Sequence, residues 1–215
     1  MKILVCISKT PDTTAKIAFT DNNTKFAADG VQWIINPYDE WYALVRAIEI
    51  KEADPSAVLH LINVGEADND PIIRKALALG GDEAIRINSV NTDTYYIATQ
   101  IAEIAKSGGY DIIFTGKETI DYNGSSLGGM IAELLNVPFI SNVTKFDLQN
   151  ASAIVTREIE GGEEKAFLGA SRLFRERKVK LVMFERLGRT NMGAIEEFMT
   201  SNNYQIFRVV EDHAL

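Results

Sequence analysis

A glycine- and serine-rich segment, GKETIDYNGSSLGG at residues 116–129, contains the residues best suited to bind a ligand. It follows an apolar run and precedes a stretch with helical periodicity. Small residues let a backbone approach a ligand closely, and the first N–H groups of a helix attract anions. The N–H groups at 124–128, the hydroxyls of Ser125 and Ser126 and the Lys117 ammonium could together hold a phosphate. The same composition also suits a simple turn, and the segment matches neither a Walker loop nor a GxGxxG fingerprint.

Patterns for acid–base or nucleophilic catalysis do not occur elsewhere in the sequence. His60 and His213 have no neighbouring carboxylate pattern, and no HExxH, GxSxG or paired-carboxylate arrangement is found. The single cysteine, Cys6, excludes an intramolecular disulfide and a cysteine-based metal site, and its apolar neighbours indicate a buried thiol. We therefore expect no catalytic residue and no metal ligand.

The polar and aromatic residues around NPYDE at 36–40 have structural interpretations. Asn36 suits a helix cap, and Pro37 suits a first helical turn. Trp33 and Trp41 flank this turn, and core packing is the simpler interpretation of them, with contact to a flavin or partner as the alternative. The carboxylates that suit caps and solvated helix faces are Asp39, Glu40, Asp121 and Glu133.

Composition restricts the classes of partner. The 215 residues carry a net charge of −8, with 22 basic and 30 acidic residues and one short basic cluster at 172–180. Binding to nucleic acid or to an anionic membrane depends on clustered Lys and Arg, so we expect neither. The apolar stretch near the N-terminus is too short for a signal peptide or a membrane span, and a cytoplasmic location is expected by default.

Short apolar runs alternate with helical patterns over the first two-thirds of the chain. Strands are predicted at 2–8, 57–65, 83–88 and 111–117, and helices at 36–53, 71–79, 94–109 and 127–135. Such alternation is typical of parallel βαβ units, so the expected class is α/β with a doubly wound, mainly parallel, Rossmann-like sheet. After Pro138 the pattern changes to antiparallel strands at 139–148 and 151–161, followed by a strand–helix–strand pattern at 178–186, 191–202 and 204–212.

Ligands of open parallel sheets bind beyond the carboxyl ends of the strands, where the strand order reverses. Residues 6–9, 63–65 and 116–128 each follow a predicted strand. We therefore expect these three segments to form one nucleotide-binding edge.

Several segments taken together resemble the beta subunit of electron transfer flavoproteins. They are KILVCISKTPDT, NPYDEWYALVRAIEIKE, IIRKALALGGDEAIRI, DIIFTGKETIDYNGSSLGGMIAELLNVPFIS and VTREIEGGEE, in the order of the family and over residues 1–164. The resemblance implies an adenine-nucleotide-binding domain at 1–164 that binds AMP, or a second FAD in electron-bifurcating members. It also implies a heterodimer with an alpha subunit that holds the redox-active FAD. That pair takes electrons from dehydrogenases such as acyl-CoA dehydrogenase and passes them to a quinone reductase or another acceptor.

The resemblance implies nucleotide contacts at the ends of two strands, in the NPYDE turn and along the glycine-rich loop. These residues are Cys6, Asn36, Pro37, Tyr38, Asp39, Val64, Gly116, Lys117, Glu118, Thr119, Ile120, Asp121, Tyr122, Asn123, Gly124, Ser125, Ser126 and Leu127.

Two features depart from the family. Leu127 stands where the family usually has a polar residue, and residues 165–215 show neither the family's dehydrogenase-recognition segment nor its C-terminal arm. We expect 165–215 to be a divergent segment packed on the same domain. The alternatives are a subunit that binds its own FAD, a free-standing nucleotide-binding module of the universal-stress type, and an enzyme whose active site lies in the C-terminal part.

Overall fold

The computed structural model describes residues 1–149, 152–158 and 192–202. The chain divides into two compact units, Met1–Phe139 and Ile140–Leu215. The predicted domain boundary at 164/165 lies outside the described residues and stays a prediction.

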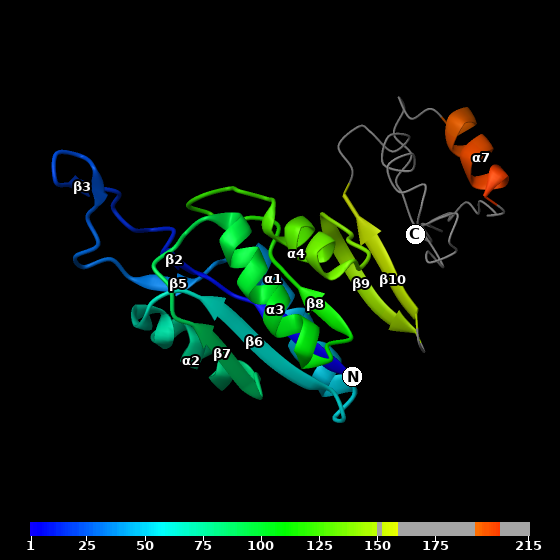
Figure 1. Cartoon of the computed structure of the whole chain (residues 1–215), viewed down its shortest axis with the longest axis horizontal. Coiled ribbons are helices and arrows are strands. Elements are labelled where there is room, and N and C mark those ends of the chain that lie inside the picture. Colours follow the sequence, from blue (N-terminus) through cyan, green and yellow to red (C-terminus); the bar gives the residue numbers. More distant parts are fainter. Residues whose placement is uncertain (150–151, 159–191, 203–215) are drawn as a thin grey trace, which may run out of the picture. The chain divides into compact units, whose positions relative to one another are not determined.

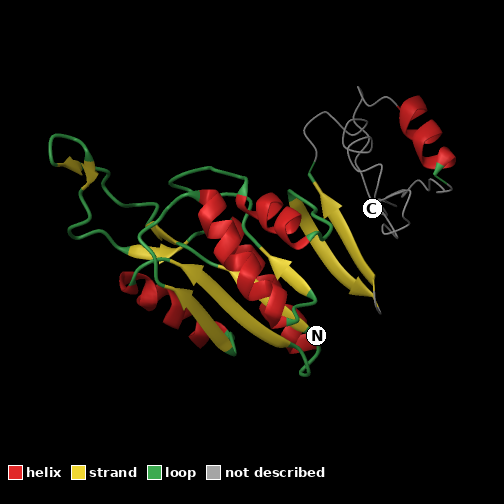
Figure 2. Cartoon of the chain, viewed as in Figure 1, coloured by secondary structure: helices red, strands yellow, loops and turns green. Residues whose placement is uncertain are grey.

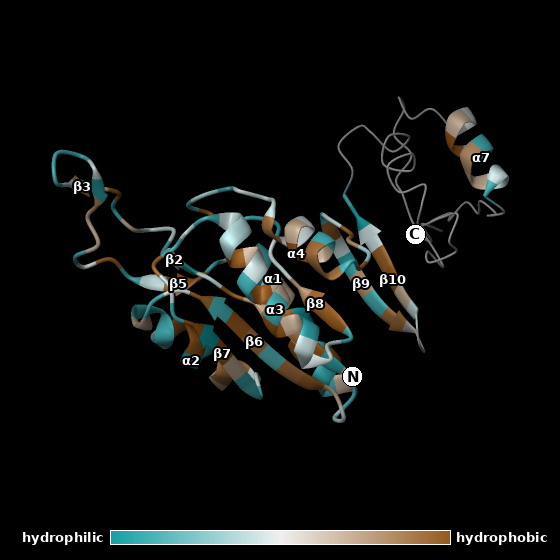
Figure 3. Ribbon diagram, in the orientation of Figure 1, coloured by the Kyte–Doolittle hydropathy of each residue, from teal (hydrophilic) through white to brown (hydrophobic). Residues whose placement is uncertain are grey.

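The first unit is built on a parallel sheet with the strand order β7-β6-β1-β8 (Figures 1 and 2). The strands are β1 (Lys2–Cys6), β6 (Val58–Val64), β7 (Glu83–Ile87) and β8 (Ile112–Phe114). β1 lies in the interior of the sheet, pairing Leu4 with His60 of β6 on one side and with Ile113 of β8 on the other. Figure 3 shows that the central strand β6 is largely hydrophobic, and Ile3, Leu4 and Val5 of β1 are fully buried, as expected for strands that are covered on both faces.

Helices cover both faces of this sheet. They are α1 (Asp39–Ala53), α2 (Asp70–Leu79, preceded by a 3-10 turn at Ala67–Asn69), α3 (Thr94–Gly108) and α4 (Leu127–Leu135). Leu4 and Ile62 pack with α3 and α4, which lie in front of the sheet in Figure 1. Side chains alternate along a strand, so Leu61 points to the opposite face, where it contacts Gly81 at the end of α2. The predicted doubly wound α/β class is confirmed.

The ends of the helices follow local sequence signals. Asp93 caps α3 by accepting a hydrogen bond from the Tyr96 N–H at 2.8 Å, and Gly109 ends that helix in the left-handed conformation. Pro71 lies in the first turn of α2, and Asn136 ends α4 in the left-handed conformation. The predicted bounds of α2, α3 and α4 are therefore correct to within a residue.

The region between β1 and α1, where the sequence predicts neither strand nor helix, contains short antiparallel strands. β2 (Lys9–Pro11) pairs with β5 (Trp33–Ile35), and β3 (Phe19–Thr20) pairs with β4 (Lys25–Phe26). Strands of two or three residues carry no recognisable alternation, and β2 and β5 pair across more than twenty residues of chain. A pairing between segments that far apart cannot be recognised in any short stretch of the sequence.

The second unit contains the predicted antiparallel hairpin, formed by β9 (Val143–Gln149) and β10 (Ser152–Arg157). The predicted C-terminal helix is present as α7 (Met192–Ser201), with Ile195 and Met199 buried. The strands predicted at 178–186 and 204–212 lie outside the described residues.

Among the helices of the described residues, none is both long enough and apolar enough to cross a bilayer.

Candidate functional site

The carboxyl ends of the parallel strands form one edge of the sheet. From β1 the chain continues through α1 to β6 on one side, and it returns later through α3 to β8 on the other side. The strand order therefore reverses between β6 and β8, with β1 at the switch point. Open α/β sheets bind their ligands at this position. The structure places the ends of β1, β6 and β8 here, as predicted.

The NPYDE turn is joined to the loop after β8 by three hydrogen bonds. The Asn36 side chain is fully buried, donates from Nδ2 to the Glu118 carbonyl at 2.9 Å and accepts at Oδ1 from the Ile120 N–H at 3.1 Å. The Asp39 carboxylate accepts from the Glu118 N–H at 3.1 Å. Two segments some eighty residues apart in the sequence are thus held as one unit. The contact between the predicted site segments 36–39 and 116–120 is therefore present in the structure.

Asn36 does not cap a helix, contrary to the sequence interpretation. α1 begins at Asp39, and no side chain caps its first turn. Tyr38, just before the helix, has φ 65° and ψ −94° and is 58% exposed. A non-glycine residue in such a conformation is strained by about 1–3 kcal/mol. The hydrogen bonds of Asn36 and Asp39 on either side hold it there.

Glu40 was expected on a solvated helix face, and that expectation is wrong. The residue is 6% exposed, and its carboxylate accepts from the Ser8 N–H at 2.6 Å and from the Ser8 hydroxyl at 2.8 Å. Gly116 lies directly against it, since a Cβ at Gly116 would stand 2.6 Å from the Glu40 Cγ. Burial raises the pKa of Glu40 to about 8, although the Ser8 hydrogen bonds oppose that rise. The Glu40 residue thus links the chain after β1, through its carboxyl, and the chain after β8, through its Cγ, to α1.

The glycine-rich loop after β8 is largely exposed. The Thr119 carbonyl accepts from the N–H groups of Tyr122 and Asn123, which makes a turn, and Asn123 and Ser125 have φ of 54° and 48°. The Ser125 hydroxyl donates to the Glu118 carboxylate at 2.8 Å. The residues of the loop that are exposed are Lys117, Ile120, Asp121, Tyr122, Asn123, Gly124 and Ser125.

The loop leads directly into the first turn of α4, which begins at Leu127. The Ser126 side chain makes no capping hydrogen bond to the helix. The first N–H groups of a helix have no partner within it. The donors that suit a phosphate are therefore the α4 N-terminus, the hydroxyls of Ser125 and Ser126 and the Lys117 ammonium. To bind a phosphate with its hydroxyl, Ser125 would have to release Glu118.

The two other strand ends carry the remaining predicted residues. Val64 ends β6 and packs against the core beneath α3 and α4. Beside it, the buried Asn63 donates to the Ile7 carbonyl at 2.9 Å and accepts from Asn69 at 3.0 Å. These two asparagines fix the edge between β1 and α2. In the sequence, Asn63 stands out as a polar residue at the end of an otherwise apolar strand.

Cys6 ends β1 with its thiol in the core between the sheet and helices α3 and α4. The predicted buried thiol is confirmed, and a nucleotide contact at Cys6 would have to involve its backbone. Burial raises the thiol pKa, and the charge of Glu40 adds to that rise.

Iodoacetamide is therefore expected to label Cys6 of the native protein slowly. The rate of labelling should be limited by the opening of the structure that exposes the thiol. Full labelling, one group per chain, is expected after denaturation in urea. Mass spectrometry of samples quenched over time measures both. Rapid stoichiometric labelling of native protein at neutral pH would contradict the buried placement of the thiol.

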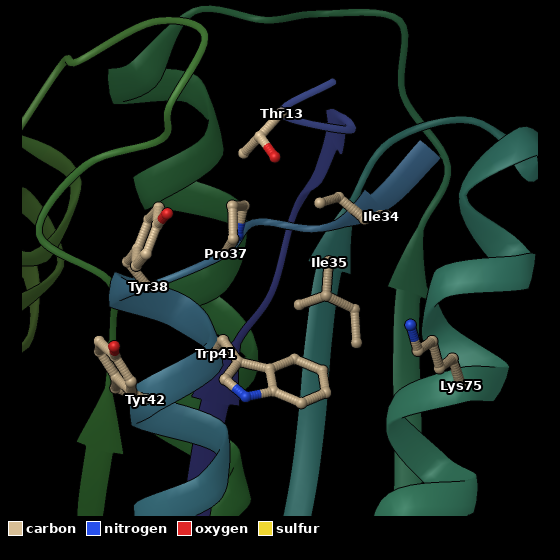
Figure 4. A pocket seen from close by; sticks show the side chains of 8 residues that line it. All are labelled: Thr13, Ile34, Ile35, Pro37, Tyr38, Trp41, Tyr42 and Lys75. Carbon is tan, nitrogen blue, oxygen red and sulfur yellow. The ribbon is translucent and has the colours of Figure 1, made fainter. Parts of the chain in front are cut away.

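A separate pocket of about 370 Å³ opens beside α1, on the side of the sheet that carries α1 and α2 (Figure 4). Tyr38, Trp41 and Tyr42 line it from the start of α1, and Lys75 reaches from α2 toward the Trp41 ring, with its ammonium 5.8 Å from the ring centroid. Of the predicted site residues, only Pro37 and Tyr38 line this pocket. The expected core packing is wrong for Trp41, which is half-buried at the pocket wall.

Trp33 is also half-buried. Its ring lies edge-on to Phe26 at 6.0 Å, and the Lys9 ammonium lies 4.5 Å from its centroid. The expected core packing is therefore incomplete for this tryptophan too.

Fold and site together define a doubly wound α/β protein whose candidate ligand edge lies at the switch point of its sheet. The family model of the electron transfer flavoprotein domain matches residues 23–168. The chain belongs to the electron transfer flavoprotein family and to its beta-subunit branch.

Three relatives illustrate this branch. An electron transfer flavoprotein subunit beta of Bacillus subtilis is 34% identical over 169 residues, which are 77% of this chain and 64% of the relative. The subunit of Syntrophomonas wolfei is 34% identical, over 76% of this chain and 64% of its own length. CarD, a subunit of the caffeyl-CoA reductase-Etf complex of Acetobacterium woodii, is 31% identical over 76% of this chain and 63% of its own. The matches thus span just under two-thirds of the length of these relatives.

Proposed function

We propose that this chain is the beta subunit of a heterodimeric electron transfer flavoprotein of the cytoplasm and that it binds AMP at the switch point of its sheet. In this role it supports an FAD-bearing alpha subunit that carries electrons from dehydrogenases to a quinone reductase or another acceptor. The chain itself supplies no acid–base chemistry in this proposal. Its contributions are the binding of the nucleotide and the docking surface for the alpha subunit.

The observation that carries the proposal is the fixed connection between the NPYDE turn and the loop after β8. Asn36 and Asp39 hold the loop backbone at residues 118–120, and the loop then runs into the N-terminus of α4. A helix N-terminus at the switch point, preceded by small residues, is suited to the phosphate of a nucleotide. The donor set of α4, Ser125, Ser126 and Lys117 fits a phosphate monoester.

FAD at the same site is the alternative cofactor, and the two are distinguished by what the purified chain carries. AMP would be released as a colourless adenine nucleotide on denaturation, whereas FAD would give a yellow protein with flavin absorbance. The family membership favours a heterodimer over a free-standing universal-stress-type module. For such a module the signature would be a stable homodimer that binds ATP.

The experiment is co-expression with an alpha subunit of the electron transfer flavoprotein family, followed by size-exclusion chromatography and analysis of the bound nucleotides. We expect a one-to-one complex that contains FAD and AMP. The absence of a complex together with the absence of any adenine nucleotide would refute the proposal. The chain expressed alone is the control, and it should retain or rebind AMP because the proposed site lies within residues 1–139.

A further inference from the structure

We propose that Glu40 is a positioning residue of the nucleotide site and that its carboxyl takes up a proton when a phosphate-bearing nucleotide binds beside it. This inference rests on the proposed function, because the nucleotide site is the one proposed above. It adds a proton to the binding reaction and assigns that proton to one residue.

Glu40 lies where three elements of the site meet. Its carboxylate accepts both hydrogen bonds that Ser8 can donate, which fixes the chain leaving β1. Its Cγ and backbone N–H lie against Gly116, which leaves β8. Its neighbour Asp39 holds the Glu118 N–H in the loop. A change in the charge of Glu40 therefore occurs at the junction that shapes the loop.

The surroundings of the carboxyl disfavour its negative charge. No lysine or arginine of the described residues pairs with it, and its hydrogen bonds come from Ser8 alone. The charges that act on it are Asp39 on α1 and Asp121 in the loop after β8, both of the same sign. The Glu40 charge also acts on the Cys6 thiol of β1, which lies in the core under α3 and α4. The charges that act on Glu40 are thus of its own sign.

A phosphate adds further negative charge to an already acidic site. Besides Glu40, the carboxylates of the NPYDE turn and the loop are Asp39, Glu118 and Asp121, and the only lysine of the loop is the exposed Lys117. At the neighbouring strand ends, Lys9 and Asp68 neutralise each other as an ion pair. Like charges raise the pKa of a carboxyl group. Glu40 is the buried member of the group, and burial already raises its pKa to about 8. The nucleotide should therefore push Glu40 further toward its protonated form, which still accepts from the Ser8 N–H and can donate to the Ser8 hydroxyl.

Proton uptake on binding fixes the direction in which the affinity for AMP changes with pH. The bound state holds more protons than the free state, so the affinity for AMP falls as the pH rises through about 8. If the phosphate raises the pKa by about one unit, the affinity at pH 9 should be about fivefold weaker than at pH 7. Adenosine lacks the phosphate and should show little of this dependence.

The test is isothermal titration of the nucleotide-free full-length chain with AMP and with adenosine between pH 7 and pH 9. Buffers of different ionisation enthalpy give the number of protons taken up. The wild-type chain should take up a fraction of a proton with AMP near pH 8. The Glu40→Gln chain should take up none, and its affinity for AMP should be flat over this range. The Ser8→Ala chain loses a hydrogen bond that favours the charged form, so its proton uptake should persist and shift to higher pH.

Several results would overturn the inference, and they differ in whether they also reject the proposed function. Equal proton uptake in the wild-type and Glu40→Gln chains would reject the role of Glu40 but leave AMP binding intact. No AMP binding at any pH would reject the proposed function and the inference together. If Glu40→Gln does not fold, two other measurements test its role. The role of Glu40 is rejected if proton uptake by the Ser8→Ala chain occurs at the same pH as in the wild-type chain. It is also rejected if the wild-type chain takes up as many protons with adenosine as with AMP.

Discussion

Replacing Asn36 with alanine is expected to destabilise the first unit by about 2–4 kcal/mol and to weaken AMP binding strongly. The Asn36 side chain is fully buried and makes two hydrogen bonds to the backbone of the loop, at Glu118 and Ile120. The substitution leaves a carbonyl and an N–H without their partner, and each unsatisfied buried group costs about 1–3 kcal/mol. The freed loop would no longer be held against the start of α1. Urea denaturation measures the stability, and titration calorimetry measures the affinity.

The matched control is Asn91→Ala. Asn91 is exposed and accepts one hydrogen bond, from the Asp93 N–H at 2.9 Å. Water replaces such a bond, so the loss should stay below about 1 kcal/mol. Equal destabilisation by both substitutions would show that Asn36 does not hold the loop. Unchanged AMP affinity in Asn36→Ala would show that the loop is not the nucleotide site.

Gly128→Ala is expected to destabilise the protein by about 1–3 kcal/mol, whereas Gly129→Ala one residue later should be neutral or slightly stabilising. A Cβ at Gly128 would stand 2.7 Å from the Thr115 hydroxyl oxygen and 2.9 Å from Phe139 Cε2. Both distances are shorter than van der Waals contact, so α4 or these two side chains would have to shift, and overpacking of this kind costs about 1–3 kcal/mol. A Cβ at Gly129 would have its nearest neighbour at 3.6 Å, an ordinary contact. Alanine there gains up to about 1 kcal/mol of helix propensity.

Both glycines lie in the first turn of α4, so the pair separates close packing from helix propensity. In thermal and urea denaturation, Gly128→Ala should be less stable than the wild-type chain, and Gly129→Ala should be as stable or slightly more stable. The close approach of α4 to β8 would be refuted if Gly128→Ala were as stable as Gly129→Ala. Since the same turn offers its N–H groups to the ligand, Gly128→Ala should also reduce the affinity for AMP.

The parallel sheet could be predicted because its two central strands are buried on both faces. Such strands appear in the sequence as continuous apolar runs, as in Lys2–Cys6 and Val58–Val64. The helices α2, α3 and α4 carry terminal signals at Pro71, Gly109 and Asn136 that act locally. The pairs β2–β5 and β3–β4 could not be predicted, since their strands are too short to show a period and depend on contacts between distant segments.

The strand ends that form the candidate site could be located from the sequence, but the contacts of their residues could not. The strand ends and the loop follow from the rule for parallel sheets. The pattern at 36–40 indicated a cap at Asn36 and a solvated Glu40, because both residue types favour those positions at the start of a helix. The structure uses both as buried links instead, through partners at Glu118, Ile120 and Ser8. Local propensity cannot reveal a partner that lies eighty residues away.

The nucleotide site is tested most directly by amide hydrogen exchange of the full-length chain with and without AMP. AMP should slow exchange at residues 124–128, at the start of α4, and at residues 36–40 and 118–120, which are bonded to each other. Protection confined to the pocket around Trp41 and Lys75, or no change at saturating AMP, would contradict a nucleotide site at the switch point of the sheet.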